Sequence, residues 1–376
     1  MPQLYDIGII GGGLGGLTLA IQAAQQGYAV VLYEKEEYPF HKVCGEYISM
    51  ESWNFLERCG VPLNSWELPK INRLKISAPS GKEFSYDLPL GGFGISRFKL
   101  DHALYETALK LGVKIHTATR VNDVTPEDEH FMIASDTVSS NAQVVVGAFG
   151  KRANLDVKWG RSFVQQKATK INNFIGVKYH IDFPQPLDTI SLHNFKNGYC
   201  GISAIEDNRY CLCYLTTAAN LADSGNSIPQ MEATILSANK HLAHIFSTAR
   251  FLYEKPLTIS QISFNKKQQV MDHILFAGDA AGSITPLCGN GMSMAMHAGH
   301  LALEQIGLFL HHKISRNDME SAYAKNWQKQ FANRTASGRM VQRFFGGTAT
   351  ELFLSVVGQS KFLSRKLIEQ THGSPF

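Results

Sequence analysis

A glycine-rich turn near the start of the chain has the residue types and spacing of a dinucleotide-binding loop. Gly11, Gly13 and Gly16 follow a short apolar segment and precede a run of small and apolar residues. In that setting the first glycine permits a tight turn, the second lets backbone N–H groups approach a pyrophosphate, and the third lets a helix pack closely on a strand. Leu14, inside the turn, is expected to lie against the same ligand. A glycine-rich turn with no ligand is the alternative, which this complete context disfavours.

An acidic residue stands where such a ligand would place a ribose. Glu34 follows Gly11 by 23 residues, at the end of the second predicted strand. A carboxylate there can accept hydrogen bonds from both ribose hydroxyls, and it would repel a 2′-phosphate. The first motif therefore suits FAD or NAD rather than NADP.

A second glycine-rich segment lies far along the chain, after another buried strand. A flavin needs a carboxylate for its ribityl hydroxyls and a helix N-terminus at its N1/C2 edge, where negative charge accumulates on reduction. Asp279 and the N–H groups of a helix that begins near Gly291 meet these needs, although a capping aspartate followed by a glycine loop is the alternative. The residues of this segment expected to contact the cofactor are Gly278, Asp279, Pro286, Gly289, Asn290, Gly291 and Met292. The two motifs together predict FAD.

With both motifs in view, the sequence resembles the clan of para-hydroxybenzoate hydroxylase-like flavoprotein monooxygenases, and more closely its geranylgeranyl reductase-like branch. The segment from Gly278 to Met292 resembles the second FAD fingerprint of the clan, and Ser96-Arg97-Phe98-x-x-Asp101 resembles its middle landmark. Pro39-x-x-x-x-Cys44-Gly45-Glu46 is similar to the Pro-x-x-x-x-Cys-Gly-Gly segment of the reductase branch. The resemblance covers most of the chain and weakens after residue 310.

The resemblance implies a fold and several further roles. Lys35 would flank the adenosine ribose beside Glu34, Arg97 would contact the FAD phosphates or ribityl chain, and Val121 would present its backbone to adenine. Arg97 could instead form a structural ion pair with Asp101. The implied fold is mixed α/β: a GR2-type, Rossmann-like FAD-binding domain with an inserted antiparallel β-sheet substrate domain and C-terminal helices.

Cys44 and Glu46 are the candidate catalytic residues, because the resemblance places their loop near the reactive face of the flavin. A thiol there could donate a proton during C=C reduction, or form an adduct with the ring if its pKa were lowered; a small buried apolar side chain is the alternative. Glu46 and His41 could supply acid–base function or serve only as hydrogen-bonding groups of the loop. No metal site is expected, since the six cysteines show no Cys-x-x-Cys spacing.

Two departures limit what the resemblance implies. Phe149 stands where monooxygenases of the clan carry an aspartate that helps with FAD and NAD(P)H, so NAD(P)H as a transient electron donor is in doubt. The stretch from Gly198 to Ser203 replaces an aromatic substrate segment of geranylgeranyl reductases, so specificity for a polyprenyl chain does not carry over. Flavin halogenases are a third relative, but the chain has no Trp-x-Trp-x-Ile-Pro segment, which disfavours halogenation.

These observations predict an FAD-dependent oxidoreductase that acts on a bulky, largely apolar or aromatic small molecule. The clan fingerprint favours a monooxygenase that hydroxylates through a C4a-hydroperoxyflavin. A flavin-dependent C=C reductase of the geranylgeranyl reductase type is the first alternative. A non-catalytic or redox-sensing flavin-binding protein and a plain NAD dehydrogenase are the others.

The elements that must position these residues can be read from apolar periodicity. Strands at residues 5–10 and 28–34 with a helix between them form a βαβ unit, and strands 141–147 and 274–277 continue the same layer. Alternating segments separated by turns between residues 163 and 264 predict a mostly antiparallel sheet. The predicted organisation is a discontinuous FAD-binding domain at 1–70, 95–160 and 265–312, a substrate domain at 71–94 and 161–264, and a C-terminal helical region at 313–376.

Composition excludes several classes of protein. The 376 residues are 44% apolar and 18% charged, as in an ordinary folded enzyme. The net charge of +4 comes from scattered Lys and Arg, so no nucleic-acid partner is expected. No apolar stretch is long enough to span a bilayer and no signal-like segment opens the chain. We expect a cytoplasmic protein, with peripheral membrane contact and oligomeric state left open.

Overall fold

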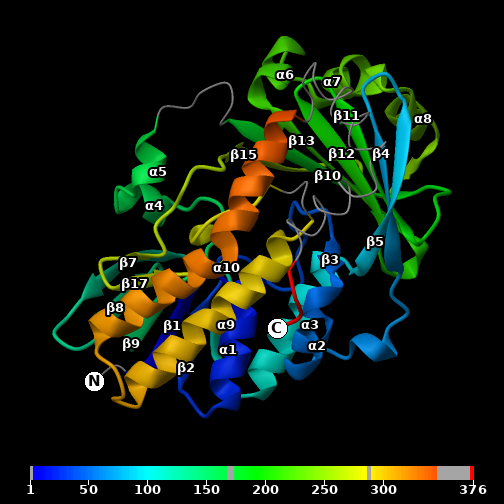
Figure 1. Ribbon diagram of the computed structural model, residues 1–376. Coiled ribbons are helices and arrows are strands. Elements are labelled where there is room, and N and C mark those ends of the chain that lie inside the picture. Colours follow the sequence, from blue (N-terminus) through cyan, green and yellow to red (C-terminus); the bar gives the residue numbers. More distant parts are fainter. Residues whose placement is uncertain (1–2, 167–172, 286–288, 345–372) are drawn as a thin grey trace.

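The computed structural model describes residues 3–166, 173–285, 289–344 and 373–376 (Figure 1). The strands fall into two sheets. Sheet A contains β1 (Leu4–Ile10), β2 (Val30–Tyr33), β6 (Lys114–His116), β7 (Val121–Pro126), β8 (Phe131–Ser135), β9 (Ser139–Gly147), β16 (Val270–Met271) and β17 (Ile274–Phe276). Sheet B contains β3 (Tyr47–Ser49), β4 (Lys70–Ser77), β5 (Glu83–Gly94), β10 (Phe174–Asp182), β11 (Thr189–Phe195), β12 (Gly198–Ala204), β13 (Tyr210–Thr217), β14 (Arg250–Phe251) and β15 (Leu257–Ile262).

The centre of sheet A is parallel, in the order β17, β9, β1, β2, β6. β1 and β2 are near-continuous runs of buried apolar residues, as expected for parallel strands covered on both faces. Parallel strands end at one edge of a sheet, so the loops after β1, β2, β9 and β17 gather there. Gly11, Glu34, Phe149 and Gly278 each stand in one of these loops. This edge is where ligands bind in open α/β sheets.

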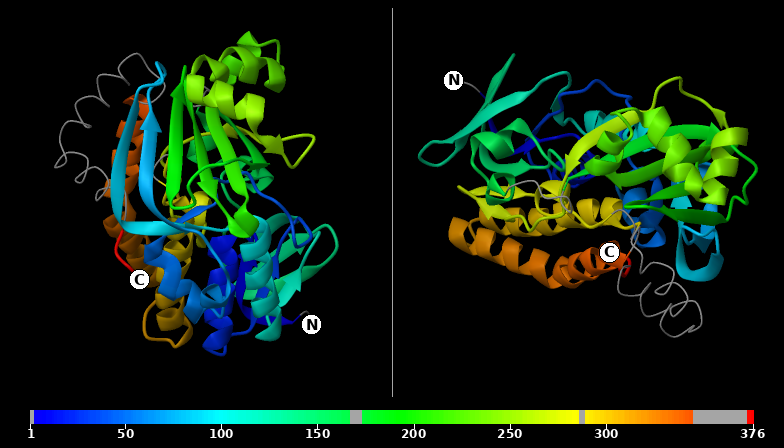
Figure 2. Two further views of the ribbon diagram at one scale, coloured as in Figure 1. Left: turned by 90° about the vertical axis from the view of Figure 1, so that its right-hand side faces the viewer. Right: turned by 90° about the horizontal axis from the view of Figure 1, so that it is seen from above.

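Four helices pack beside sheet A: α1 (Leu14–Gln25), α3 (Arg97–Lys110), α9 (Gly291–Leu310) and α10 (Arg316–Phe344). α1 and α9 approach closely, because a Cβ on Gly15 would lie 2.8 Å from the carbonyl oxygen of Ala295. α10 packs along α9 and forms an outer layer (Figure 2). The shorter helices are α2 (Trp53–Arg58), α4 (Asn154–Lys158), α5 (Ser162–Gln165), α6 (Ala218–Asp223), α7 (Ile228–Thr234) and α8 (Lys240–Thr248).

Sheet B is antiparallel except for the pair β4–β11. Helices α6, α7 and α8 lie on one side of it (Figure 2), where they close an apolar cluster with alternate residues of β10, such as Val177 and Ile181. The intervening residues of β10 point to the other face, toward the loop that precedes β3. There Lys178 donates to the carbonyl oxygen of Lys42, and a Cβ on Gly176 would lie 3.2 Å from Val43. The predicted mixed α/β fold with an antiparallel sheet is therefore confirmed.

Several sequence expectations are met only in part or lie outside the described residues. The strand β3, which follows directly after Glu46, pairs with β5 at the edge of sheet B, whereas α2, which comes next, packs in the core beside sheet A. The predicted domain boundaries remain predictions. The predicted C-terminal helical region is represented by α10. Pro286 and residues 345–372 are outside the described part of the chain.

Candidate functional site

The glycines of the first motif are held by close contacts that leave no room for a side chain, with one exception. Gly11 has φ +108°, and a Cβ there would lie 2.5 Å from the carbonyl oxygen of Ala148. A Cβ on Gly16 would lie 2.0 Å from the carbonyl oxygen of Gly11. Gly13 differs, because the nearest atoms to its Cβ position are Nζ of Lys42 at 3.7 Å and Nη2 of Arg97 at 3.8 Å. An open backbone face beside two cationic side chains fits the pyrophosphate of a dinucleotide.

Arg97 is placed by an ion pair as well as by this loop. Ser96 caps α3 by accepting a hydrogen bond from the backbone N–H of Lys99. Arg97, in the first turn, makes two hydrogen bonds of 2.7 Å to Asp101. The ion pair with Asp101 is therefore present, and Nη2 of Arg97 lies 3.8 Å from the Cβ position of Gly13, while the contact of Arg97 with FAD remains a prediction. Lys42, which the sequence reasoning missed, lies 3.4 Å from Asp101 and 3.8 Å from Glu34.

The predicted ribose and adenine contacts occupy different environments. Glu34 is 6% exposed, and its Oε2 accepts a hydrogen bond of 2.9 Å from the backbone N–H of Gly12. This bond orients the carboxylate beside the glycine turn. Lys35 points to solvent, where its ammonium lies 3.6 Å from Glu36. Val121 is buried at the start of β7, opposite Ser135 of β8. Leu14 is buried as the first residue of α1.

The second glycine segment lies at the same edge of sheet A. Asp279 is in a short 3₁₀ turn, η5 (Gly278–Ala280), directly after β17, and its carboxylate lies 3.7 Å from Nζ of Lys151. Lys267 joins this turn to the loop after β9 by donating to the carbonyl oxygens of Asp279 and Lys151, at 2.7 and 2.6 Å. Burial lowers the pKa of Lys267 to about 8.

The start of α9 provides a helix N-terminus close to this turn. Asn290 is the N-cap, Gly291 is the first helical residue, and Gly289 has φ +64°. The aligned N–H groups of a 20-residue helix create partial positive charge at this end. Phe149, where related monooxygenases carry an aspartate, packs instead near the rings of Trp159 and Phe276.

Cys44 lies beside the N-terminus of α9. Its Sγ is partly exposed and lies 3.5 Å from Sδ of Met292, in the first turn of the helix. The carbonyl oxygen of Cys44 accepts a hydrogen bond of 3.2 Å from the thiol of Cys211 on β13. The thiol therefore stands between the predicted flavin-binding helix and sheet B.

Glu46 is completely buried and makes hydrogen bonds through both carboxylate oxygens. Its Oε1 lies 2.5 Å from Nζ of Lys178 and accepts from the backbone N–H of Arg97 at 2.7 Å. Its Oε2 lies 2.6 Å from Nε2 of His180. Burial alone would raise the pKa of Glu46, but Lys178 and His180 together lower that pKa to about 2. Glu46 is thus a carboxylate at neutral pH, tied to both α3 and β10.

Sequence reasoning did not find the residues of sheet B that complete this site. β10 and β13 pair so that Lys178 is opposite Cys213 and His180 is opposite Cys211. The four side chains share the face that contacts the loop at residues 42–46. Lys and His at alternate positions of the otherwise apolar segment Phe174–Ile181 were a signal that could have been used.

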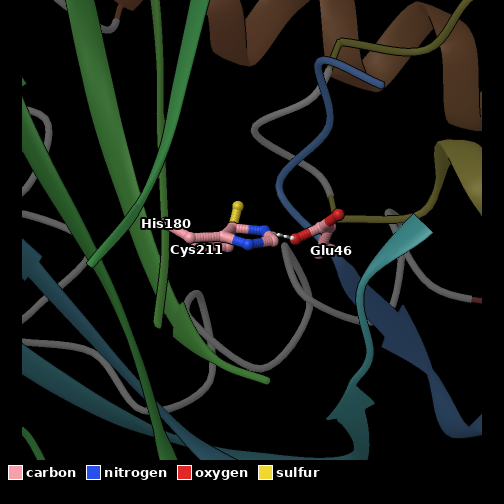
Figure 3. Close-up of side chains that lie close together, drawn as sticks. All are labelled: Glu46, His180 and Cys211. Carbon is pink, nitrogen blue, oxygen red and sulfur yellow. Dashed lines mark hydrogen bonds and ion pairs between the residues drawn. The ribbon is translucent and has the colours of Figure 1, made fainter. Parts of the chain in front are cut away.

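Glu46, His180 and Cys211 are also close enough to suggest a metal site. One potential ligand atom from each lies within 4.8 Å of the other two (Figure 3). The ammonium of Lys178, however, lies against the same carboxylate, and its charge would repel a metal ion. Burial also raises the pKa of the Cys211 thiol well above its ordinary value, which opposes metal ligation. We therefore assign the cluster to an ion pair with a histidine partner.

Comparison with known proteins identifies related sequences across most of the chain. A digeranylgeranylglycerophospholipid reductase of Methanosarcina acetivorans is 24% identical over 363 residues, covering 88% of this chain and 82% of the relative. Conditioned medium factor receptor 1 of Dictyostelium discoideum is 23% identical over 370 residues, covering 91% of this chain and 71% of that protein.

Solved structures share the fold at low identity. The flavin-dependent brominase Bmp2 has a TM-score of 0.81 at 19% identity, covering 98% of this chain and 93% of its own. A geranylgeranyl bacteriochlorophyll reductase-like protein from Thermoplasma acidophilum has a TM-score of 0.76 at 18% identity, covering 97% and 96%. The p-nitrophenol 4-monooxygenase of Pseudomonas putida has a TM-score of 0.76 at 14% identity, covering 98% and 97%. A brominase, a reductase-like protein and a monooxygenase thus share this fold, so the fold alone does not identify the reaction.

Among the helices of the described residues, none is both long and apolar enough to cross a membrane. A family model described as an FAD binding domain matches residues 4–326. The glycine cradle beside Lys42 and Arg97, the turn at Asp279 and the N-terminus of α9 fit that cofactor. The chain belongs to this FAD-binding-domain family and is an FAD-dependent oxidoreductase.

Proposed function

We propose that this oxidoreductase saturates a C=C bond in a bulky, largely apolar small molecule. The observation that carries the proposal is the position of Cys44, whose partly exposed thiol stands 3.5 Å from Met292 at the start of α9 and next to β13 of sheet B. A thiol in that position can give a proton to a substrate held between the two layers. The relationship to digeranylgeranylglycerophospholipid reductases supports the same reaction class.

Reduction of a C=C bond needs a hydride and a proton, and bound reduced FAD supplies the hydride. Cys44 would supply the proton and become a thiolate. Lys178 and Arg97 both carry a positive charge and both interact electrostatically with this thiol. Glu46 keeps Lys178 in place through the 2.5 Å ion pair and stays ionised itself.

The inner face of sheet B provides an apolar wall next to these polar groups. Leu215 is two residues from Cys213 on β13 and therefore points to the same side of the sheet. It belongs to a buried cluster with Phe174, Leu192 and Tyr199 from the neighbouring strands. A bulky apolar substrate could extend along this wall while its double bond lies near Cys44.

The sequence favoured hydroxylation, and the same experiment decides between the two reactions. FAD-loaded protein would be reduced without oxygen and mixed with a panel of apolar alkenes, including polyprenyl glycerolipids and aryl alkenes. We expect the oxidised flavin absorbance near about 450 nm to return without oxygen, together with a product that has gained two hydrogens. A product that forms only with oxygen and carries one added oxygen atom would contradict the proposal.

The variant Cys44→Ser tests the role of the thiol in that assay. We expect it to slow substrate reduction by about 100-fold or more while FAD stays bound. The matched control is Cys59→Ser, because Cys59 is buried at the end of α2 in the core of the FAD-binding layer. Equal rates for Cys44→Ser and the wild-type protein would exclude Cys44 as the proton donor.

A further inference from the structure

A continuous chain of hydrogen bonds leads from a half-exposed histidine to the buried ion pair. Nε2 of His41 lies 3.0 Å from the hydroxyl of Tyr253, and this hydroxyl lies 2.7 Å from Nδ1 of His180. Nε2 of His180 lies 2.6 Å from Oε2 of Glu46, and Oε1 of Glu46 lies 2.5 Å from Nζ of Lys178. Four consecutive contacts thus connect five side chains.

His180 and Glu46, inside this chain of hydrogen bonds, each use one atom toward the preceding residue and a different atom toward the next. His180 uses Nδ1 on one side and Nε2 on the other, and Glu46 uses its two oxygens in the same way. The hydroxyl of Tyr253 can donate and accept at once. Uptake of a proton at Nδ1 of His180 can therefore be followed by release from Nε2, and a proton taken up at Oε2 of Glu46 reaches Lys178 by rotation of the carboxyl group. An ion pair that only joined the loop before β3 to β10 would need Glu46, Lys178 and His180, and not the extension through Tyr253.

The protonation states at the outer end suit transfer. Burial, with Lys178 and His180 next in effect, lowers the pKa of His41 to about 4, and burial raises the pKa of Tyr253 to about 12. Both groups are neutral at neutral pH, so the His41 ring keeps one nitrogen that can accept a proton, and Tyr253 keeps the hydroxyl proton that it can donate. The carbonyl oxygen of His180 accepts from the backbone N–H of Leu252, which fixes the Tyr253 loop on β10.

The two ends of the chain lie in different surroundings. His41 stacks on Phe98, which is 39% exposed, so its ring is close to solvent. Lys178 at the inner end is buried and interacts electrostatically with Cys44 and Cys211. Other charged or titratable groups that interact with this hydrogen-bond chain are Arg209 and Cys211 near Tyr253, and Cys211 and Cys213 near Glu46 and Lys178.

We propose that His41, Tyr253, His180, Glu46 and Lys178 conduct protons between solvent and the side of sheet B where the Cys44 thiol meets the N-terminus of α9. One proton enters at His41 for each proton that leaves Lys178 toward this side, so the hydrogen-bond chain ends each transfer unchanged in charge and no electrons move. The inference goes beyond the proposed reaction, because reduction of bound FAD itself takes up protons whichever substrate later reoxidises it.

The test needs no substrate. FAD-loaded protein in weak buffer with a pH-indicator dye would be reduced without oxygen by the methyl viologen radical, whose oxidation releases no proton, under rapid mixing, and proton uptake would be compared with loss of flavin absorbance. In the wild-type protein we expect proton uptake to follow flavin reduction without delay. Tyr253→Phe removes the relay hydroxyl and should slow proton uptake by roughly tenfold or more. Tyr210→Phe is the matched control, because the hydroxyl of Tyr210 binds the backbone of Gln185.

A second variant guards against loss of folding in Tyr253→Phe. His41→Ala removes a half-exposed side chain, and added imidazole should restore its proton uptake, which a purely structural role would not allow. Proton uptake at the wild-type rate in His41→Ala, or in folded Tyr253→Phe, would overturn the proposal. The rate of alkene reduction is not part of this test, so its outcome is independent of the proposed reductase activity.

Discussion

The glycine turn at residues 11–16 and the wall formed by β10 and β13 solve different problems of recognition. The turn presents backbone, and its residues are chosen for the absence of a side chain: Gly16 has no space for a Cβ. The wall presents side chains, Lys178 and His180, which β-sheet pairing brings opposite two cysteines. The residues of the backbone site are close together in the sequence, whereas the residues of the side-chain site come from strands far apart in the sequence.

The largest effect should come from adding a methyl group to the turn. Gly16→Ala would place Cβ 2.0 Å from the carbonyl oxygen of Gly11, a contact that neither backbone segment can relieve. We expect a loss of more than about 4 kcal/mol in the free energy of unfolding of the apoprotein, measured by urea denaturation.

The matched variant is Gly13→Ala, whose Cβ would have no neighbour closer than 3.7 Å. Its apoprotein should unfold like the wild-type protein, while FAD affinity falls by about tenfold or more, equal to about 1.4 kcal/mol. FAD binding by Gly13→Ala at the wild-type affinity would show that the cofactor does not approach this face of the turn.

The next effect concerns the ion pair of the wall. Lys178→Met leaves the carboxylate of Glu46 buried without its cationic partner, and both side chains have 0% exposure. We expect a loss of about 3–5 kcal/mol in the free energy of unfolding at neutral pH. Combining it with Glu46→Gln should cost less than the sum of the two single changes, because the pair is lost only once. Strict additivity would contradict direct coupling between the two residues.

A fall in pH should destabilise the ion pair of the β10–β13 wall more than the glycine turn. The pKa of Glu46 is about 2 in the folded protein, below the value of 4.5 for an unperturbed glutamate, because Lys178 and His180 outweigh burial. Its contribution is therefore complete above pH 4.5 and is lost as the pH falls toward 2, an effect of about 3 kcal/mol. The stability of Glu46→Gln should lack this part of the acid dependence. Parallel pH profiles for the variant and the wild-type protein would contradict the assignment.

The smallest expected effect is a difference in FAD affinity between variants of two lysines, Lys42 and Lys35. Lys42→Met removes an ammonium beside Gly13 and should weaken FAD binding by about tenfold, with a smaller effect at high salt. Lys35→Met should change the affinity by less than about twofold, since the Lys35 side chain is 61% exposed and faces Glu36. Titration of apoprotein with FAD measures both. Equal losses in the two variants would support the ribose contact predicted for Lys35.

The sequence was sufficient for the parts of the molecule that depend on local geometry. Gly11, Gly16 and Glu34 reveal a βαβ unit because their spacing along one short segment meets its steric and hydrogen-bonding needs, such as the close approach of Gly16 to Gly11 and the bond from Gly12 to Glu34. The strands β11, β12 and β13 were also predictable from their turns and alternation.

The side-chain site could not be predicted in the same way. His180 and Cys211 meet Glu46 only because of the register of β10 with β13 and the packing of sheet B on the loop before β3, and neither is encoded by a local pattern. Sequence reasoning found Glu46 and Cys44 from a resemblance, but it assigned no partner to either residue. The ionised state of Glu46 follows from Lys178 and His180, which are more than 130 residues away in the sequence.

A crystal structure of the FAD complex would test most directly whether the turn and the wall serve one reaction. The decisive quantity is the distance from Sγ of Cys44 to the nearest reactive atom of the isoalloxazine ring or of a bound apolar ligand. We expect a distance within about 6 Å, which is two hydrogen-bond lengths and allows one bridging group. A longer distance, with Cys44 separated from the ring by other side chains, would contradict the claim that this thiol takes part in the chemistry.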